Sequence, residues 1–168
     1  AYQLAYFAVM MKARAYSRRI LNEGIRPHLC AIQESNGIPK QEVMDIFARL
    51  AEGPLWSDKL RDDVEYLIDV FKDAKEYGSV LEIKPIYFAA IEEVIEFIRE
   101  SKTVLNIFEA PYKDMILQKF PGLVEQGRLL SQKYDVVVTN PPYMGNSGMG
   151  AKLSEYVKKN YPDTKSDM

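Results

Sequence analysis

The sequence predicts an α/β fold that carries a largely α-helical insertion. Three observations support this prediction. The chain opens with a helical pattern followed by a short apolar run, residues 39–133 repeat apolar side chains at helical spacing, and residues 134–139 form a β-branched run. We therefore expect three parts: residues 1–38 and residues 134–168 belong to one α/β core, and residues 39–133 are a helical insertion between them.

The first part, residues 1–38, predicts one helix and one buried strand. Residues 2–21 follow a helical pattern that is apolar on nearly every face in its first half, which is typical of a helix buried on more than one side. Gly24 lies just beyond that pattern and indicates where the helix stops. Residues 28–33 (HLCAIQ) are mostly apolar and are closed by residues 35–37 (SNG), so we expect a short buried strand there.

The second part, residues 39–133, predicts a series of amphipathic helices. Their expected starts are Pro39, Ser57, Tyr87 and residue 111. Residues 79–84 predict either a short strand or an extended link, and Pro121-Gly122 predicts an interruption of the last helical stretch. The apolar stripes indicate surfaces that face a core. The segment is too long and too regularly patterned for a loop.

The composition indicates a soluble cytoplasmic protein that binds neither a membrane nor a metal. The chain has 168 residues, of which 47% are hydrophobic, and its net charge of −2 gives no overall attraction to nucleic acid. Cys30 is the only cysteine and His28 the only histidine, which excludes a disulfide framework and a cysteine–histidine zinc cluster. We expect His28 to be a polar residue at a strand edge and Cys30 a small core residue. No apolar run approaches the roughly 20 residues that cross a bilayer, and the start lacks the pattern of a signal peptide.

Asn140-Pro141-Pro142-Tyr143, directly after the run at 134–139, is the candidate catalytic motif. An aromatic exocyclic amine such as that of adenine is a poor nucleophile because its lone pair is delocalised into the ring. Two acceptors aimed at its N–H bonds, the Asn140 side-chain oxygen and a carbonyl exposed by the rigid Pro141, would favour a tetrahedral nitrogen. Tyr143 could stack on a base that has left its helix. The alternative is a turn that only ends a strand, with Tyr143 in a packing role.

The motif and its surroundings resemble the adenine-N6 DNA methyltransferases. Residues 134–145 (YDVVVTNPPYMG) and 151–163 (AKLSEYVKKNYPD) are similar to the large methyltransferases of BREX phage-defence systems, the PglX-like group. Residues 1–14 (AYQLAYFAVMMKAR) resemble the helix that follows the cofactor-binding segment of that group, and residues 32–35 (IQES) also match closely. The resemblance spans nearly the whole chain.

This resemblance implies a partial Rossmann-like S-adenosylmethionine-dependent methyltransferase core that carries the helical insertion. It also implies transfer of a methyl group from S-adenosylmethionine to a flipped adenine of double-stranded DNA, in phage defence or restriction-modification. Other defence-system proteins are then possible partners. Lysines toward the end of the chain could approach phosphates, although solvated helix ends explain them equally well: Lys158, Lys159 and Lys165.

The same resemblance implies that Gln33 or Glu34 contacts the adenine of the cofactor, with a solvent-facing strand end as the alternative reading. The glycine-rich cofactor loop of the family should precede Ala1, and the chain has no convincing G-x-G segment in a strand-to-helix turn. The chain also starts within a helical pattern and stops without a finished element. We therefore expect an internal fragment that binds S-adenosylmethionine weakly or not at all and is inactive by itself.

Three alternatives to a DNA methyltransferase without a fused nuclease remain open. The same motif serves methyltransferases that modify RNA or a glutamine amide of a protein, although the long insertion favours DNA. Residues 39–133 could form a non-catalytic helical docking module of a defence complex. A fused restriction-modification enzyme would share the methyltransferase chemistry.

Overall fold

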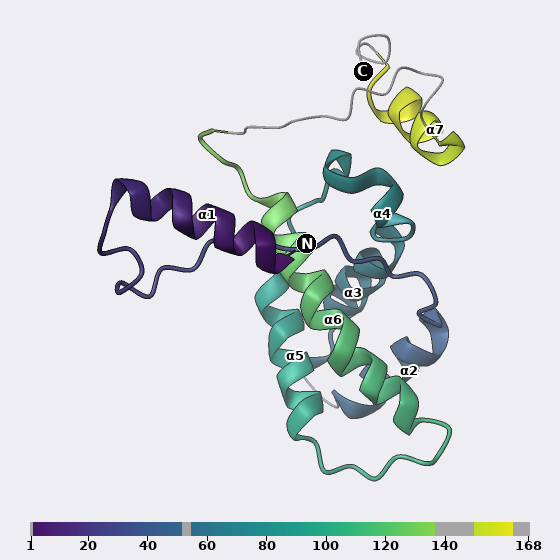
Figure 1. Ribbon diagram of the computed structural model, residues 1–168. Coiled ribbons are helices and arrows are strands. Elements are labelled where there is room, and N and C mark those ends of the chain that lie inside the picture. Colours follow the sequence, from purple (N-terminus) through teal and green to yellow (C-terminus); the bar gives the residue numbers. More distant parts are fainter. Residues whose placement is uncertain (1, 52–54, 137–149, 163–168) are drawn as a thin grey trace.

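The computed structural model describes residues 2–51, 55–136 and 150–162, and every regular element in these ranges is a helix. Helices α2 (Lys40–Leu50), α3 (Asp58–Val70), α5 (Phe88–Glu100) and α6 (Ala110–Ser131) pack together as a bundle (Figure 1). The short helices α4 (Ala74–Tyr77) and η2 (Gly78–Val80) lie at one end of this bundle, where they meet α7 (Ala151–Asn160). Helix α1 (Tyr2–Tyr16) extends away from it.

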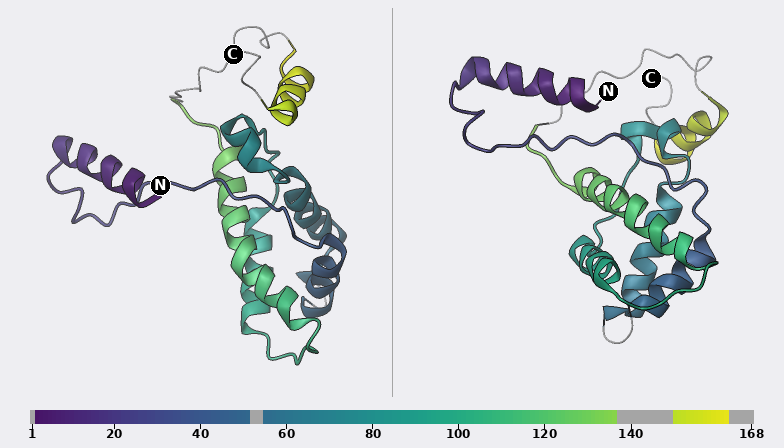
Figure 2. Two further views of the ribbon diagram at one scale, coloured as in Figure 1. Left: turned by 45° about the vertical axis from the view of Figure 1, so that its right-hand side comes forward. Right: turned by 60° about the horizontal axis from the view of Figure 1, so that its bottom comes forward.

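The predicted α/β fold is wrong for the described residues, which contain no strand and no sheet, so a partial Rossmann-like core is not seen. The apolar run at 28–33 is extended, and residues 25–38 cross the bundle at α6 (Figure 2). A strand requires a partner strand for its backbone groups. Here the backbone of Gln33 pairs with the side chain of Gln126 instead. Of the second predicted strand, residues 134–136 are described and are not in a ladder, while 137–139 lie outside the described residues.

The bundle core explains why the helical predictions for the middle of the chain hold. Each of α2, α3 and α5 buries an apolar stripe at helical spacing, and Phe47, Phe71 and Phe120 are fully buried. The rings of Phe47 on α2 and Phe120 on α6 meet edge to face, with centroids 5.0 Å apart. Burial of such faces is the main favourable term in helix packing.

The ends of the elements agree in part with the sequence. Ser57 is confirmed as the N-cap of α3, since its Oγ accepts a hydrogen bond of 3.2 Å from the Leu60 N–H. Pro39 directly precedes α2, as predicted. Of residues 79–84, predicted as a short strand or a link, the first two end η2 and residues 81–84 have no regular secondary structure, so the link is the alternative that holds. The predicted interruption at Pro121-Gly122 is wrong: α6 continues through it, because apolar neighbours on the same helix are buried in the core.

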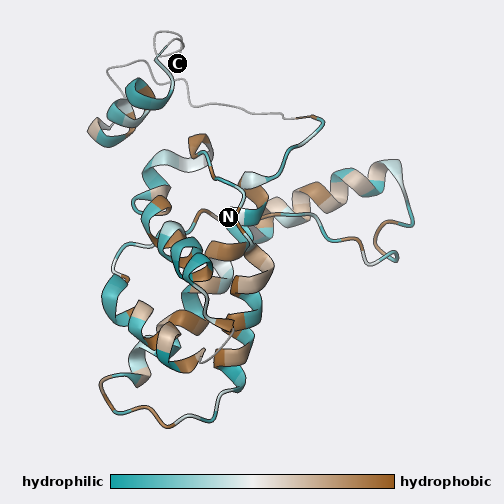
Figure 3. Ribbon diagram, turned by 180° about the vertical axis from the view of Figure 1, so that it is seen from behind, coloured by the Kyte–Doolittle hydropathy of each residue, from teal (hydrophilic) through white to brown (hydrophobic). Residues whose placement is uncertain are grey.

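Helix α1 differs from its prediction in both length and burial. It ends at Tyr16, and the following turns close at Gly24, whose φ is +66°. Leu4 is 75% exposed and Phe7 64% exposed, so the expected burial on several faces is wrong. Figures 2 and 3 show this apolar helix outside the bundle. Among the described residues, none of the helices combines the length and apolar character that a bilayer crossing requires.

Candidate functional site

The residues singled out by the sequence divide into those that the structure describes and those that it does not. Asn140, Pro141, Pro142 and Tyr143 lie outside the described residues. Gln33 and Glu34 are described, and so is α7, the helix that follows the motif. The site is therefore built from these two flanking segments, both of which are held at α4 and the adjoining helices.

Gln33 is held on the bundle by one buried side-chain amide. Its backbone N–H donates to Oε1 of Gln126 over 2.6 Å, and Nε2 of Gln126 donates to the Gln33 carbonyl over 3.1 Å. Gln126 lies on α6 and is completely buried. Its amide thus pairs with the extended chain as a neighbouring strand would, which satisfies polar groups that would otherwise be costly to bury. The side chain of Gln33 itself is exposed.

Glu34 lies at the edge of a small polar hollow. The hollow has a volume of about 200 Å³ and is lined by Gln33, Glu34, Asn36, Lys75, Lys119 and Leu123. The Glu34 carboxylate is 28% exposed and lies 3.5 Å from Nζ of Lys75. Ligand pockets are usually about 300–1,000 Å³, so this hollow is smaller than a typical ligand pocket.

Ser35 anchors the same segment to the end of α3. Its N–H donates to the Phe71 carbonyl over 3.0 Å, and its Oγ donates to the Ile68 carbonyl over 2.5 Å. Ile68 lies in the last turn of α3, where carbonyls lack an intrahelical donor, and Phe71 is the C-cap of the same helix. Ser35 is buried, and the chain then turns sharply at Gly37, whose φ is +74°. The segment is therefore fixed at two successive points.

Asn36 and Asp73 form a reciprocal pair at the start of α4. Asn36 Nδ2 donates to Asp73 Oδ1 over 2.9 Å, while the Asp73 N–H donates to Asn36 Oδ1 over 2.8 Å. Nζ of Lys152, in the first turn of α7, lies 3.0 Å from the same Asp73 oxygen. The Asn36 amide, followed by Lys152, holds the pKa of Asp73 below its usual value, and Asp73 raises the pKa of Lys152.

Aromatic contacts seat α7 against α4 and the chain that follows it. The rings of Tyr156 and Tyr77 have centroids 4.7 Å apart. The Tyr156 hydroxyl accepts from the Glu82 N–H over 3.3 Å, and the Tyr161 hydroxyl donates to the Val80 carbonyl over 3.1 Å. The helix that follows the Asn140–Tyr143 motif is therefore placed at the same end of the bundle as the segment containing Asn36.

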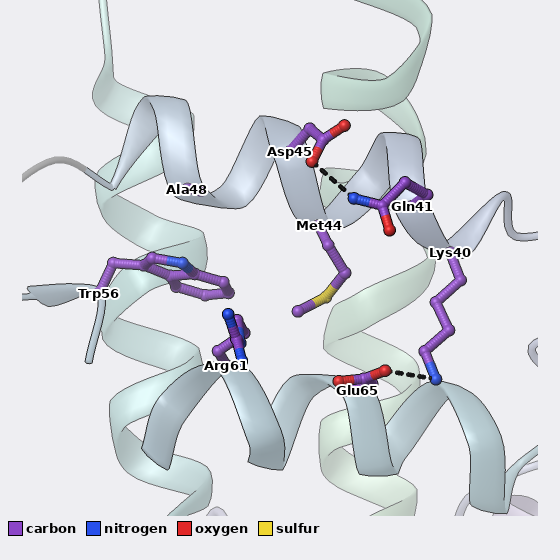
Figure 4. Close-up of a pocket in the computed structure, with 8 residues that line it drawn as sticks. All are labelled: Lys40, Gln41, Met44, Asp45, Ala48, Trp56, Arg61 and Glu65. Atoms are coloured by element: carbon purple, nitrogen blue, oxygen red, sulfur yellow. Dashed lines mark hydrogen bonds and ion pairs between the residues drawn. The ribbon is translucent and has the colours of Figure 1, made fainter. Parts of the chain in front are cut away.

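A wider groove lies between α2 and α3 (Figure 4). Its volume is about 590 Å³, and its lining residues are Lys40, Gln41, Met44, Asp45, Ala48, Trp56, Arg61 and Glu65. Trp56 stacks on Phe47 with centroids 5.3 Å apart. Lys40 Nζ lies 2.7 Å from Glu65 and 2.8 Å from Asp69, so its charge is already compensated by two carboxylates. We assign no chemistry to this groove.

The remaining singled-out residues have simpler surroundings. His28 is exposed, and Cys30 is half-buried, with burial raising the pKa of its thiol. Lys158 and Lys159 are exposed at the end of α7, and Lys165 lies outside the described residues.

Sequence reasoning missed the residues that hold the two segments together: Asn36, Asp73, Gln126 and Lys152. Gln126 gave one usable signal, a polar residue within the buried stripe that includes Leu123 and Val124. Asp73 and Lys152 gave none, because exposed charges are frequent on helices.

Comparison with known proteins gives matches along the whole chain. The Eco57I restriction-modification methylase family matches residues 1–168. The adenine-specific methyltransferase BrxX of Escherichia coli O9:H4 (strain HS) is 31% identical over 186 residues, which include 100% of this chain and 15% of that protein. The adenine-specific methyltransferase PglX of Lacticaseibacillus casei (strain Zhang) is 30% identical over 168 residues, 100% of this chain and 13% of that protein. The chain thus spans only a small part of these curated relatives.

Proposed function

The chain belongs to the Eco57I restriction-modification methylase family, and from this membership we propose that it is part of a site-specific adenine-N6 DNA methyltransferase. The parent protein transfers a methyl group from S-adenosylmethionine to the exocyclic amine of an adenine flipped out of double-stranded DNA. Its biological setting is restriction-modification or phage defence, together with other defence proteins. Two relatives, both named adenine-specific methyltransferases, support the reaction class.

The observation that carries this proposal is the Asn140–Tyr143 motif in a chain that matches such relatives over its full length. Asn140 and the Pro141 carbonyl accept hydrogen bonds from the adenine amine and so direct its lone pair toward the methyl group. Pro141 and Pro142 restrict the backbone, and Tyr143 stacks on the flipped base. The reaction needs S-adenosylmethionine as methyl donor and no metal.

In this proposal Gln33 or Glu34 contacts the adenine of the cofactor. We call residues 33–36, which include both, the cofactor-contact segment. The support is geometric: Gln126 and Ser35 fix the backbone of this segment, the Gln33 side chain stays exposed, and Glu34 borders the polar hollow. Residues 1–38 and 134–168 then carry the site, and residues 39–133 are the helical insertion that supports it. We propose that this chain alone binds S-adenosylmethionine weakly and is inactive by itself, because its sequence has no convincing G-x-G segment in a strand-to-helix turn.

A substrate comparison with the full-length parent tests the proposal. Labelled S-adenosylmethionine is supplied together with double-stranded DNA, with RNA or with a release-factor-like protein. The expected result is label in double-stranded DNA, recovered as N6-methyladenine. Label found only in RNA or only in a protein glutamine would mean that this molecule, and not DNA, is the substrate. Absence of methyl transfer to all three would overturn the proposal that the parent is an enzyme.

A further inference from the structure

We propose that Asp73 is a positioning residue that joins the cofactor-contact segment to the helix following the target-base motif, so that cofactor binding and DNA binding are coupled through it. This inference rests on the proposed function, which places cofactor at Gln33 and Glu34 and the target adenine at the Asn140–Tyr143 motif. Asp73 belongs to neither segment, and the coupling would be a contribution of the helical insertion.

The first half of the connection is the link between Asp73 and the cofactor-contact segment. Two reciprocal hydrogen bonds, 2.8 and 2.9 Å long, join Asp73 to Asn36. Asn36 is the last residue of the cofactor-contact segment, two positions after Glu34. Asp73 has a φ of +57° and is, among the described residues, the single non-glycine with a positive φ. Such a conformation is uncommon outside glycine and persists where surrounding contacts determine it. The pair with Asn36 supplies those contacts.

The second half is the link between Asp73 and α7. The Oδ1 atom that accepts from Asn36 is the same atom that lies 3.0 Å from Nζ of Lys152. Lys152 also lies 3.5 Å from Glu76, a second carboxylate of α4. Any shift of Lys152 therefore changes the charge balance on the oxygen that holds Asn36. The two segments share one acceptor atom.

Helix α7 is seated firmly enough to transmit such a shift. Tyr156 packs on Tyr77, Tyr161 bonds to the Val80 carbonyl, and Val157 is 3% exposed. Lys152 lies in the first turn of α7, the end that is nearer in sequence to the target-base motif. In this proposal, DNA bound by the parent acts on the Asp73 pair through this first turn of α7.

The expected coupling is modest in size. The Asp73 side chain is 19% exposed and that of Lys152 is 52% exposed, so solvent screens their attraction. Exposed ion pairs change an equilibrium by roughly fivefold at most. We therefore expect the pair to account for a two- to fivefold effect of DNA on cofactor affinity.

The test uses the full-length parent and four variants: Lys152→Met, Asp73→Asn, the double variant and Arg128→Met. Calorimetry gives the Kd of S-adenosylhomocysteine, which cannot donate a methyl group, with and without unmethylated plasmid DNA. The ratio of the two values is the coupling factor. Arg128 is the control for Lys152, since their side chains are 45% and 52% exposed and each forms an ion pair. Arg128 pairs with Glu92 between α6 and α5, and neither residue belongs to the two coupled segments.

The proposal expects both single variants to lower the coupling factor two- to fivefold, the double variant to lower it no further, and Arg128→Met to leave it unchanged. A wild-type factor of one, an unchanged factor in the single variants, or losses that multiply in the double variant would overturn it. A parent that binds no S-adenosylhomocysteine would instead refute the proposed function. As an independent readout, hydrogen exchange at residues 33–37 should accelerate in Lys152→Met and not in Arg128→Met; equal rates in both would also contradict the link.

Discussion

Replacing Gln126 by methionine removes both hydrogen bonds to the Gln33 backbone and keeps nearly the same side-chain volume. The lost bonds are 2.6 and 3.1 Å long, and Gln126 is completely buried. A typical intramolecular hydrogen bond contributes about 0.5–1.5 kcal/mol net, so the pair contributes about 1–3 kcal/mol. Because Gln33 is exposed, its freed N–H and carbonyl can bond to water once the segment lifts. We therefore expect a loss in the lower half of that range, about 1–2 kcal/mol.

Two assays separate this effect from general damage to the core. Urea unfolding followed by circular dichroism gives the free energy of unfolding, and hydrogen exchange gives the protection of the Gln33 amide. The matched control is Ile116→Val, a substitution of a fully buried residue on the same helix that should cost about 0.5–1.5 kcal/mol. Only Gln126→Met should expose the Gln33 amide to exchange.

Equal protection of that amide in wild type and Gln126→Met would refute the reasoning, whatever the change in unfolding free energy. So would an unfolding free energy that the substitution leaves unchanged. Either result would mean that the contact is formed without determining where the segment lies.

Three further predictions concern the bundle and its contact with α7. Alanine at Gly127 would place a Cβ 2.7 Å from an aromatic ring of α5, whereas at Gly122 the nearest atom is 3.5 Å away and belongs to an exposed side chain. In urea unfolding, Gly122→Ala should therefore stabilise by up to about 1 kcal/mol and Gly127→Ala should destabilise by about 1–2 kcal/mol; the opposite order would contradict the close helix packing. Ser57→Ala removes the N-cap of α3 and should lower the melting temperature through a loss of about 1 kcal/mol, while Ser57→Asp should retain most of the stability. Because the Asn36 amide and Lys152 lower the pKa of Asp73, its contribution is present above the usual aspartate pKa of about 3.9 and is lost as pH falls through the lower folded value. The unfolding free energies of wild type and Lys152→Met in urea should thus differ at pH 6, and the difference should shrink as pH falls below about 3.9. A difference that stays constant with pH would contradict the ion pair.

The helices that the sequence predicts correctly are those whose partners lie within residues 39–133. Val43, Phe47 and Leu50 on α2 recur at a spacing that only a helix places on one face, and the bundle buries that face. Ser57 was readable as an N-cap because its hydrogen bond is local in sequence. Both signals depend on neighbours a few residues apart.

The incorrect predictions depend on partners far away in sequence. The run at 28–33 has the composition of a strand, yet its end at Gln33 pairs with a side chain 93 residues further along. The apolar pattern of α1 predicts a helix buried against other elements. The pattern alone cannot show that Leu4 and Phe7 are exposed in the described structure. At Pro121, the burial of Phe120 and Leu123 outweighs the missing hydrogen bond.

In the candidate site, too, residues close together in sequence could be predicted and contacts between distant residues could not. The chemistry of Asn140–Tyr143 could be proposed from residue types alone, because the motif is contiguous. Asp73 could not be found in this way. Its oxygen is shared by Asn36 and Lys152, which are 116 residues apart in sequence and meet only in the fold.

The most direct measurement is the amount of N6-methyladenine formed in double-stranded DNA by the full-length parent and by its Asn140→Ala variant. Removing one preorganised acceptor from a transition state typically lowers kcat by roughly 100- to 1,000-fold. We predict a fall of that size, with S-adenosylhomocysteine affinity unchanged because the proposed role of Asn140 is to contact the base and not the cofactor. An Asn140→Ala variant that methylates adenine at the wild-type rate would contradict the central claim that this motif activates the adenine amine.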